Sequence, residues 1–344
     1  MSMSRLRKHT VGAAVAALAF AAGLAGPAAA QDLRQVTFVQ PSPSAINSFP
    51  VFTAIGEGFF ADEGLEVTVE SLNGSAAVLQ ALSAGQADFG RPGPGPILAA
   101  RSRGGDPDFI YNVAARSYFV IVVEEDSEYQ AIEDLRGTVI GTGTADGAEV
   151  GFARNVLTGA GMTEGEDYTF LTVGDGGPAT AAFTRGDISA YAASTADAAI
   201  LNQRGVAVRD ITPAEYARFF GNGLATMGDT IRNDRELVEK FGRAFARGHA
   251  FALDDANRER VLEHMAAGNP QESEDQEFAS ALFTAVRSKT IPIDDSMGLG
   301  YQPPEVWEEW QESMIAGGDL EAPLDDLTAA YTNEFVETWN AGLN

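Results

Sequence analysis

The stretch GEGFFADEGLEVTVESLNGSAAVLQALSAGQADFG, residues 56–90, decides the fold. It contains the end of a helix predicted over residues 52–62, followed by a strand over 65–72 in which apolar and polar residues alternate. A second helix is predicted over 75–84 and ends at Gly85, and Phe89 begins another short strand. Strands that alternate with helices predict a parallel sheet with helices on its faces.

The same alternation continues through most of the chain. Further strands are predicted at 36–40, 109–113 and 119–123, and a second series follows with strands at 138–142, 169–173 and 190–193. Helices are predicted at 131–135, 149–158 and 179–184 within that second series. Two α/β series predict two lobes, whose ligand cleft would lie at the carboxyl ends of the strands.

After residue 233 the pattern becomes helical almost to the end. Apolar side chains recur at three- and four-residue steps in a last predicted helix that contains Leu324, Leu327, Tyr331, Phe335 and Trp339. Trp307, Trp310 and Met314 have the same spacing. Aromatic stripes of this kind usually belong to the core, and we interpret both as packing surfaces.

The amino terminus is typical of a secretory signal peptide. Arg5, Arg7 and Lys8 precede an apolar run over 11–24, and small residues stand before Gln31. We therefore expect residues 1–30 to be removed and the rest to be a soluble protein of the periplasm. Because the chain has no cysteine, neither a lipid-modified cysteine nor a disulfide is expected.

The composition is strongly acidic. The chain has 344 residues, of which 49 are Asp or Glu and 23 are Lys or Arg, so that the formal net charge is −26. Binding to nucleic acid requires clustered positive charge, and binding to anionic lipid is likewise disfavoured. Nucleic acid and membrane surfaces are therefore not expected as partners.

Residues that would indicate catalysis or metal binding are sparse. Beyond the signal region, the histidines are His249 and His264, too far apart in sequence for a metal motif, and we expect them to be ordinary surface or half-buried side chains. No GxSxG elbow is present. We expect no catalytic residue, no metal site and no cofactor, and hence a protein that is not an enzyme.

One glycine motif offers an alternative. The stretch GTGTADG, residues 141–147, follows a predicted strand and opens a helix, as a dinucleotide-binding loop does. Its spacing is GxGxxxG instead of GxGxxG, and an exported protein would not meet free nicotinamide cofactor. Its backbone N–H groups nevertheless suit an anion or a polar oxygen.

The order of these pieces resembles the NMT1/THI5-like family of solute-binding proteins of ABC importers, which includes sulfonate, nitrate and taurine types. The family's AxxxGxFxxxGLxV segment has its counterpart in FTAIGEGFFADEGLEV, residues 52–67. The following G-x-x-D-F-G is present at residues 85–90. In the second series, AIEDLRGTVIGTGTADG, residues 131–147, and GDISAYAAS, residues 186–194, are similar to family segments.

The resemblance implies a periplasmic-binding-protein type II fold, with two α/β lobes that close on a ligand. It implies a first lobe of residues 31–118 plus 228–344 and a second lobe of residues 119–227. The chain would cross between them near 116–120 and 221–227. It also implies an ABC-importer permease as partner and a monomeric protein.

The family pattern implies ligand-binding residues at the ends of strands in both lobes. In the first lobe these are Ser44, Asn47, Phe49, Arg91, Pro92, Gly93, Arg116 and Ser117. In the second lobe they are Thr142, Thr144, Asp146, Gly147, Tyr191, Ser194 and Thr195. Many family members have an aromatic–acid–proline run where this chain has residues 194–196, STA, so ligand identity cannot be transferred from those members.

Two classes of ligand follow from these residues. Arg91 or Arg116 would grip a sulfonate or carboxylate, although either could instead pair with a surface carboxylate. Alternatively a flat heterocycle, such as a thiamine-precursor pyrimidine or a flavin, would stack on Phe49, Tyr118 or Tyr191, with Asp146 accepting a hydrogen bond. The sequence narrowly favours the anion. A pyrimidine-synthase-like enzyme is a remote alternative, because family relatives of that kind use an active-site histidine that the cleft loops lack here.

Overall fold

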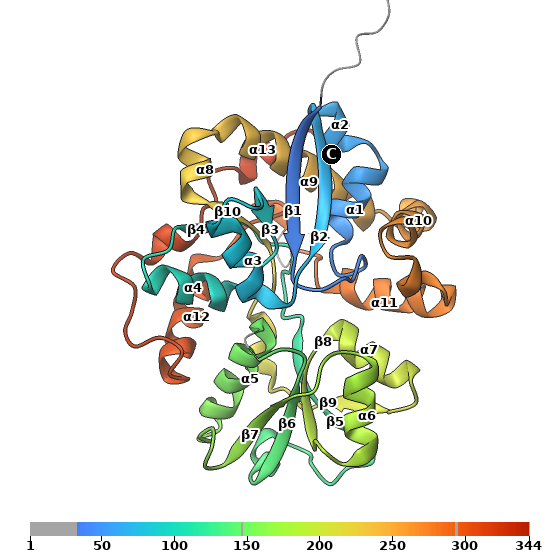
Figure 1. The fold of residues 1–344 in the computed structure, drawn as a ribbon, viewed down its shortest axis with the longest axis vertical. Helices are drawn as coiled ribbons and strands as arrows, with labels where there is room; N and C mark the ends of the chain where they lie inside the picture. The colour runs from blue at the N-terminus through green and yellow to red at the C-terminus, as the bar shows by residue number, and fades with distance from the viewer. Residues whose placement is uncertain (1–32, 146, 293–294, 344) are drawn as a thin grey trace, which may run out of the picture. The chain divides into compact units, whose positions relative to one another are not determined.

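The computed structural model describes residues 33–145, 147–292 and 295–343. The predicted signal peptide and Asp146 lie outside these described residues. Residues 34–344 belong to one compact unit, which contains two five-stranded sheets. Figure 1 shows the sheet with β1 and β2 in the upper part of the view and the sheet with β6 and β7 in the lower part.

The first sheet contains both amino-terminal strands and a strand from much later in the chain. Its strands, in spatial order, are β2 (Leu65–Ser71), β1 (Arg34–Gln40), β3 (Phe89–Gly90), β10 (Leu224–Met227) and β4 (Pro107–Tyr111). The pair β1–β2 is parallel, with Phe38 opposite Val69. Phe38 of β1 belongs to a buried hydrophobic cluster that also contains Phe89 and Phe241. The rings of Phe89 and Phe241 stack in this cluster at a centroid distance of 3.9 Å.

The second sheet is built from the middle of the chain. Its strands, in spatial order, are β7 (Tyr168–Thr172), β6 (Thr138–Thr142), β8 (Ala190–Ser194), β5 (Phe119–Glu124) and β9 (Val208–Asp210). The helices that accompany it are α5 (Ala148–Gly159), α6 (Gly177–Arg185) and α7 (Thr195–Gln203).

The remaining helices belong with the first sheet or follow it. They are α1 (Phe49–Gly56), α2 (Phe59–Asp62), α3 (Gly74–Ser83), α4 (Pro94–Ser102), α8 (Gly228–Asn233), α9 (Arg235–Leu253), α10 (Arg258–Gly268), α11 (Gln276–Ser288), α12 (Pro304–Ala316) and α13 (Val336–Asn340). Short 3₁₀ turns are η1 (Ile132–Leu135), η2 (Ala214–Arg218), η3 (Asp255–Asn257), η4 (Pro270–Ser273), η5 (Asp295–Met297) and η6 (Leu327–Ala330).

The predicted α/β class with two sheets is confirmed, but the sheets are mixed and not purely parallel. β10 runs antiparallel to β3 and β4, and β5 runs antiparallel to β8 and β9. The physical reason is that β5 and β10 are the strands that the chain enters directly after crossing between the sheets. No helical crossover precedes either strand, so neither has to run parallel to its neighbours.

The position of β10 also changes the predicted boundary between the two lobes. The sequence placed residues 119–227 in the second lobe, whereas residues 224–227 pair within the first sheet. We therefore propose a first lobe of residues 34–118 and 224–343 and a second lobe of residues 119–223. The two crossing segments, residues 112–118 and 217–223, touch each other, since the Ser117 N–H donates to the Ala217 carbonyl at 2.9 Å. We call them the connectors.

Two predicted helices are wrong in extent. The helix expected over 52–62 is divided into α1 and α2 because Gly58 adopts a φ of +76°, a left-handed conformation that interrupts a helix. The helix expected over 324–339 is interrupted because Tyr331 is extended and forms a parallel bridge to Phe109 at the edge of β4. The free edge of the sheet takes up the backbone hydrogen bonds that a helix would have made.

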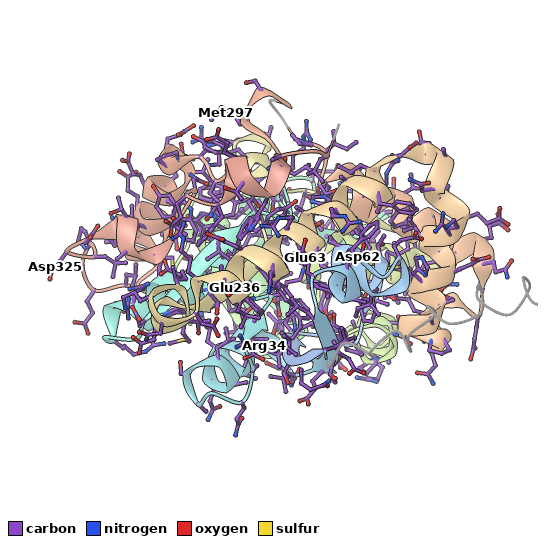
Figure 2. All side chains as sticks on the ribbon, turned by 90° about the horizontal axis from the view of Figure 1, so that it is seen from above. Arg34, Asp62, Glu63, Glu236, Met297 and Asp325 are labelled. Atoms are coloured by element: carbon purple, nitrogen blue, oxygen red, sulfur yellow. The ribbon has the colours of Figure 1, made fainter. Side chains whose placement is uncertain are left out.

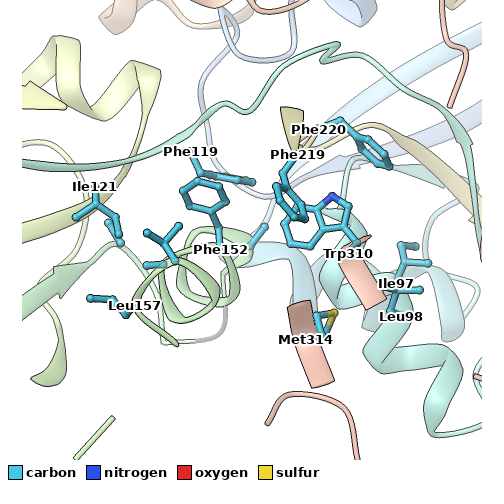
Figure 3. Close-up of a cluster of buried hydrophobic side chains, with 14 of the residues drawn as sticks. Ile97, Leu98, Phe119, Ile121, Phe152, Leu157, Phe219, Phe220, Trp310 and Met314 are labelled. Atoms are coloured by element: carbon cyan, nitrogen blue, oxygen red, sulfur yellow. The ribbon is translucent and has the colours of Figure 1, made fainter. Parts of the chain in front are cut away.

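The two lobes share one hydrophobic cluster, which extends from β5 and α5 to α4 and α12. Figure 3 shows Phe119 and Phe152 from the second lobe in this cluster with Trp310 and Met314 on α12. The interpretation of the Trp307, Trp310 and Met314 stripe as core is confirmed, since all three are buried. The lobes are therefore joined by packing as well as by the connectors.

The outer surface carries many ion pairs between exposed side chains. Figure 2 labels Asp62 and Glu63 beside one another at the end of α2. They pair with Arg247 and Arg243 of α9 at 3.0 and 2.7 Å. The Asp62 carboxylate is 61% exposed, and a pair that is this exposed contributes little to stability. Within the described residues, none of the helices is both long and apolar enough to cross a membrane.

Candidate functional site

A cavity of about 480 Å³ is lined by residues of both lobes. We call it the cleft cavity. The first lobe contributes the loop after β1 (residues 41–47), Arg91 and the segment 269–278, and the second lobe contributes residues at the starts of α5, α6 and α7. This volume lies in the range of sites for small organic ligands. Its charged lining residues are Arg91, Glu149, Asp175, Asp197, Arg204, Glu272, Glu274 and Asp275.

The loop after β1 is held by a carboxylate from a distant part of the chain. Glu272 accepts hydrogen bonds from the Ser44 hydroxyl at 2.5 Å and from the Ile46 N–H at 3.0 Å. The Ser44 oxygen in turn accepts from the Asn47 N–H at 3.0 Å. Burial raises the pKa of Glu272. Ser44, Asn47 and Glu272 therefore form a preorganised wall of the cleft cavity, although Glu272 was absent from the sequence prediction.

Arg91 stands where β3 ends, and its backbone is fixed on both sides. Its N–H donates to the Val39 carbonyl at 3.0 Å, and its carbonyl accepts from the Asn222 side chain at 3.1 Å. The guanidinium lies 5.8 Å from the centroid of the Tyr118 ring. The residue is 5% exposed, and this burial lowers the pKa of Arg91.

The charge of Arg91 is not compensated by any described carboxylate, since none of the ion pairs among the described residues includes it. Its Nε–H also has no hydrogen-bond partner there. A buried cation that keeps unused donors is costly unless a ligand supplies the acceptors. Arg91 is thus a buried guanidinium in the wall of the cleft cavity with one donor that no described residue uses.

The second lobe presents carboxylates to the same cavity. The Thr144 hydroxyl donates to Glu149 at 3.1 Å, and the Tyr191 hydroxyl donates to Asp175 at 2.9 Å. Burial, and then the charges of Asp175 and Asp197, raise the pKa of Glu149 to about 7. Glu149 is therefore partly protonated at neutral pH, when it can donate as well as accept a hydrogen bond.

Asp197 is fixed by the start of α7. Ser194 and Asp197 form a capping box, in which the Ser194 N–H donates to Asp197 at 2.9 Å and the Asp197 N–H donates to Ser194 at 3.2 Å. Burial, followed by the charge of Asp175, raises the pKa of Asp197. The S-T-A-D sequence carries this capping signal, so the helix α7 and the position of Asp197 could have been predicted.

Of the residues predicted from the family pattern, Ser44, Asn47, Arg91, Thr144 and Ser194 line the cleft cavity. Asp146 lies outside the described residues. The others are placed elsewhere: Phe49, Pro92, Gly93, Arg116, Ser117, Thr142, Gly147, Tyr191 and Thr195. Tyr191 still contacts the wall, because its hydroxyl donates to Asp175, which lines the cavity.

The aromatic residues predicted for stacking have different surroundings. Phe49 is fully buried and packs edge-on against His249 and Phe283, at centroid distances of 5.5 and 5.4 Å. Tyr118 does line the cleft cavity, and so does Phe278, which no pattern in the sequence indicates. A flat ligand would therefore meet Tyr118 and Phe278, and not Phe49.

The two predicted arginines are in different situations. Arg116 donates to the carbonyl of Ile291 at 3.1 Å and does not line the cleft cavity. Arg91 lines it and is buried. Apart from residues outside the described ranges, no group of three or more His, Asp or Glu side chains is arranged to hold a metal ion.

Comparison with known proteins places this geometry in a family. The chain is 28% identical over 319 residues, 90% of its length and 88% of the relative's, to the riboflavin-binding protein RibY of Chloroflexus aurantiacus. Its fold is similar to the periplasmic aliphatic sulphonate binding protein SsuA of Escherichia coli, at 16% identity and a TM-score of 0.65, covering 87% of this chain and 91% of that one.

A second solved structure has the same fold. The periplasmic nitrate-binding protein NrtA of Synechocystis PCC 6803 matches at 12% identity and a TM-score of 0.67, covering 91% of this chain and 90% of that one. A family profile described as NMT1/THI5 like matches residues 45–258. The predicted resemblance is thereby confirmed: the chain belongs to the NMT1/THI5-like family and has the fold of periplasmic solute-binding proteins.

Proposed function

We propose that this protein binds an uncharged, flat heterocycle with several hydrogen-bonding groups, of the flavin class, in the cleft cavity and delivers it to an ABC importer. The observation that carries the proposal is the charge of the cavity wall. Arg91 and Arg204 are opposed by Glu149, Asp175, Asp197, Glu272, Glu274 and Asp275. A ligand with a net negative charge would be repelled by most of this wall.

The proposed heterocycle differs from the small anion that the sequence narrowly favours. The anion hypothesis was based on the arginines, and Arg91 does line the cleft cavity. However, the same cavity is lined by six carboxylates, which come from both lobes. Carboxylates prefer hydroxyl and N–H donors, and a riboflavin molecule offers these on its ribityl chain and ring while remaining uncharged. The riboflavin-binding relative supports the same choice.

The described side chains suggest how such a ligand would be held. Arg91 would donate to a ring carbonyl oxygen, and Tyr118 and Phe278 would contact the ring faces. Glu149 and Asp197 would accept hydrogen bonds from hydroxyl groups. Because these groups come from both lobes, a bound ligand would favour the closed arrangement over the open one by its differential affinity.

The same proposal includes the cellular setting. The predicted signal peptide, residues 1–30, would direct the protein to the periplasm, where it would act as a monomer without catalytic turnover. The partner would be the permease of an importer, which recognises the closed form. The family membership and the fold support this role.

The experiment is a thermal-unfolding and fluorescence titration of the purified protein with riboflavin, flavin mononucleotide, taurine, nitrate and a hydroxymethylpyrimidine. At about 100 times its dissociation constant a ligand should stabilise the fold by about 2.7 kcal/mol. We expect this shift with riboflavin. Flavin mononucleotide should bind more weakly, because its phosphate would face the carboxylates.

A matched pair of variants tests the role of the cavity. Arg91→Gln should abolish the shift, whereas Arg116→Gln, which changes an arginine outside the cavity, should leave it unchanged. Stabilisation by taurine or nitrate but not by riboflavin would restore the anion hypothesis. A shift that survives Arg91→Gln would show that the ligand binds somewhere other than the cleft cavity.

A further inference from the structure

Asn222 is a buried amide in the wall of the cleft cavity. It belongs to the connector 217–223 and is 8% exposed. The other amide side chains that line this cavity are half-buried or exposed: Asn47, Gln203, Asn269 and Gln271. Asn222 is therefore the lining amide that is shielded from bulk water, where a polar atom without a partner is costly.

The hydrogen bond between Asn222 and Arg91 determines how the amide is oriented. Its Nδ2 donates to the Arg91 carbonyl at 3.1 Å. Because a carbonyl oxygen can only accept, the NH₂ group must face it and Oδ1 must point elsewhere. The neighbouring backbone fixes this arrangement, since the Gly223 N–H donates to the Pro92 carbonyl at 3.2 Å. Asn222 thus presents an acceptor in a preset orientation.

This acceptor is both unused and accessible. Oδ1 of Asn222 accepts no hydrogen bond from a described residue, and it is not among the fully buried oxygens that lack a partner. Asn222 lines the cleft cavity and neither of the two other large cavities of the described residues. The surface that Oδ1 retains therefore faces the cleft cavity.

Neither histidine offers an alternative acceptor there. The expectation that His249 lies at or near the surface is wrong, because the face of α9 that carries it packs on α1 and leaves it 1% exposed. The Tyr111 hydroxyl is 2.8 Å from its Nδ1. His264 is half-buried, as expected, and its Nε2 is 2.7 Å from Glu57. Neither ring lines the cleft cavity.

Arg91 and Asn222 together define one edge of the ligand. The cation can only donate hydrogen bonds, and Oδ1 of the amide can only accept them. A complementary ligand edge has an acceptor beside a donor. In a flavin ring the imide edge, in which an N–H stands between two carbonyl groups, meets this requirement, whereas the benzenoid end has neither group. Tyr118 and Phe119 line the same cavity and offer aromatic surface to the ring.

We propose that Asn222 is a specificity-determining residue of the cleft cavity, whose Oδ1 accepts a hydrogen bond from the imide N–H of the ligand ring. Arg91 donates to the carbonyl oxygen beside that N–H. This inference rests on the proposed function, the binding of a flavin-class heterocycle. It assigns the imide edge to Arg91 and Asn222, and it leaves the hydroxyl groups of the ligand to the carboxylates.

The test compares riboflavin with 3-methylriboflavin, in which a methyl group replaces the imide proton. Fluorescence titration of the full protein should show at least tenfold weaker binding of the methylated compound. In the Asn222→Leu variant, riboflavin should bind about tenfold more weakly and the two compounds should bind about equally. Leucine is similar in size to asparagine, so a methyl group that only clashed with this side chain would still be disfavoured. Loss of the discrimination therefore reports the hydrogen bond.

Two further variants keep the test decisive. Asn222→Ser shortens the side chain and should also abolish the discrimination, so it serves if Asn222→Leu fails to fold. Asn269→Leu is the matched control, because Nδ2 of Asn269 also donates to a backbone carbonyl, that of Pro43 at 2.9 Å. This control should retain the discrimination of the natural protein, whatever its effect on overall affinity.

Two results would overturn the inference while the proposed function stands. One is equal binding of riboflavin and 3-methylriboflavin to the natural protein, and the other is discrimination that survives both Asn222 variants. If riboflavin does not bind at all, the proposed function fails, and an NMR titration with uracil and 3-methyluracil decides the inference. Uracil binding that is lost on methylation and in Asn222→Leu would support the imide edge, and a lack of uracil binding would overturn it as well.

Discussion

Replacing Glu149 with glutamine should change how stability depends on pH. In the folded protein, burial followed by the nearby charges of Asp175 and Asp197 raises the pKa of Glu149 from 4.5 to about 7. Between these values the folded state binds more protons than the unfolded state. Stability therefore falls as pH rises through this window, and the penalty is complete above the folded pKa.

The free-energy cost of ionising Glu149 in the folded protein follows from the shift in its pKa. One pKa unit corresponds to about 1.36 kcal/mol, so the ionised Glu149 should cost the folded state about 3 kcal/mol at pH 8.5 and less than about 1 kcal/mol at pH 5. Glutamine is neutral throughout and keeps an oxygen that can accept from Thr144, as Glu149 does at 3.1 Å. The variant should gain stability over the natural protein as pH rises.

The assay is urea unfolding of both proteins, without ligand, at pH 5 and at pH 8.5. The difference in the free energy of unfolding between variant and natural protein should grow by about 2–3 kcal/mol between the two pH values. Glu308→Gln, on the exposed side of α12, serves as the control and should show no such growth. Parallel pH profiles for the Glu149→Gln variant and the natural protein would refute the reasoning.

Three further predictions concern packing and the surface, and each is measured by urea unfolding. Trp310→Ala should destabilise the fold by about 3–5 kcal/mol, since the ring is 1% exposed in the cluster shared by both lobes; a loss below about 1 kcal/mol would show that the cluster is not a joint core. Gly93→Ala should cost about 1–3 kcal/mol, because its Cβ would stand 2.5 Å from that of Ala148 on α5; an unchanged midpoint would contradict the close approach of the two lobes. Asp62→Asn should cost less than about 1 kcal/mol, because the carboxylate that pairs with Arg247 is 61% exposed; a larger loss would mean that this pair is not solvent-screened.

The strands β1 to β8 could be predicted because their signal is local, whereas the short strands β9 and β10 were missed. Alternation over 65–72 corresponds to β2, and the apolar run over 119–123 corresponds to β5. The prediction of one helix over 324–339 was wrong. Its apolar spacing carries no information about the free edge of β4, with which this segment pairs. Tyr331 becomes extended to bond that edge, which is a tertiary preference that outweighs the helical pattern.

The candidate site was less predictable than the fold, because its wall comes from separate segments. Arg91 could be placed at the end of a strand, and it lines the cleft cavity. Glu272 could not be predicted as a lining residue, since it lies among helices far along the chain. It reaches the loop after β1 only through tertiary packing. Tyr191 has the residue type expected for stacking, but its hydroxyl holds Asp175 instead.

The position of β10 in the first sheet has a consequence for the order of folding. β10 lies between β3 and β4, yet the whole second sheet precedes it in the chain. Residues 119–210 can form their sheet from neighbouring segments, whereas the first sheet must wait for residues 224–227 and close a long loop. Until then β3 and β4 each have an unpaired edge. During synthesis or refolding, this is the interval in which the chain is most exposed to edge-to-edge aggregation.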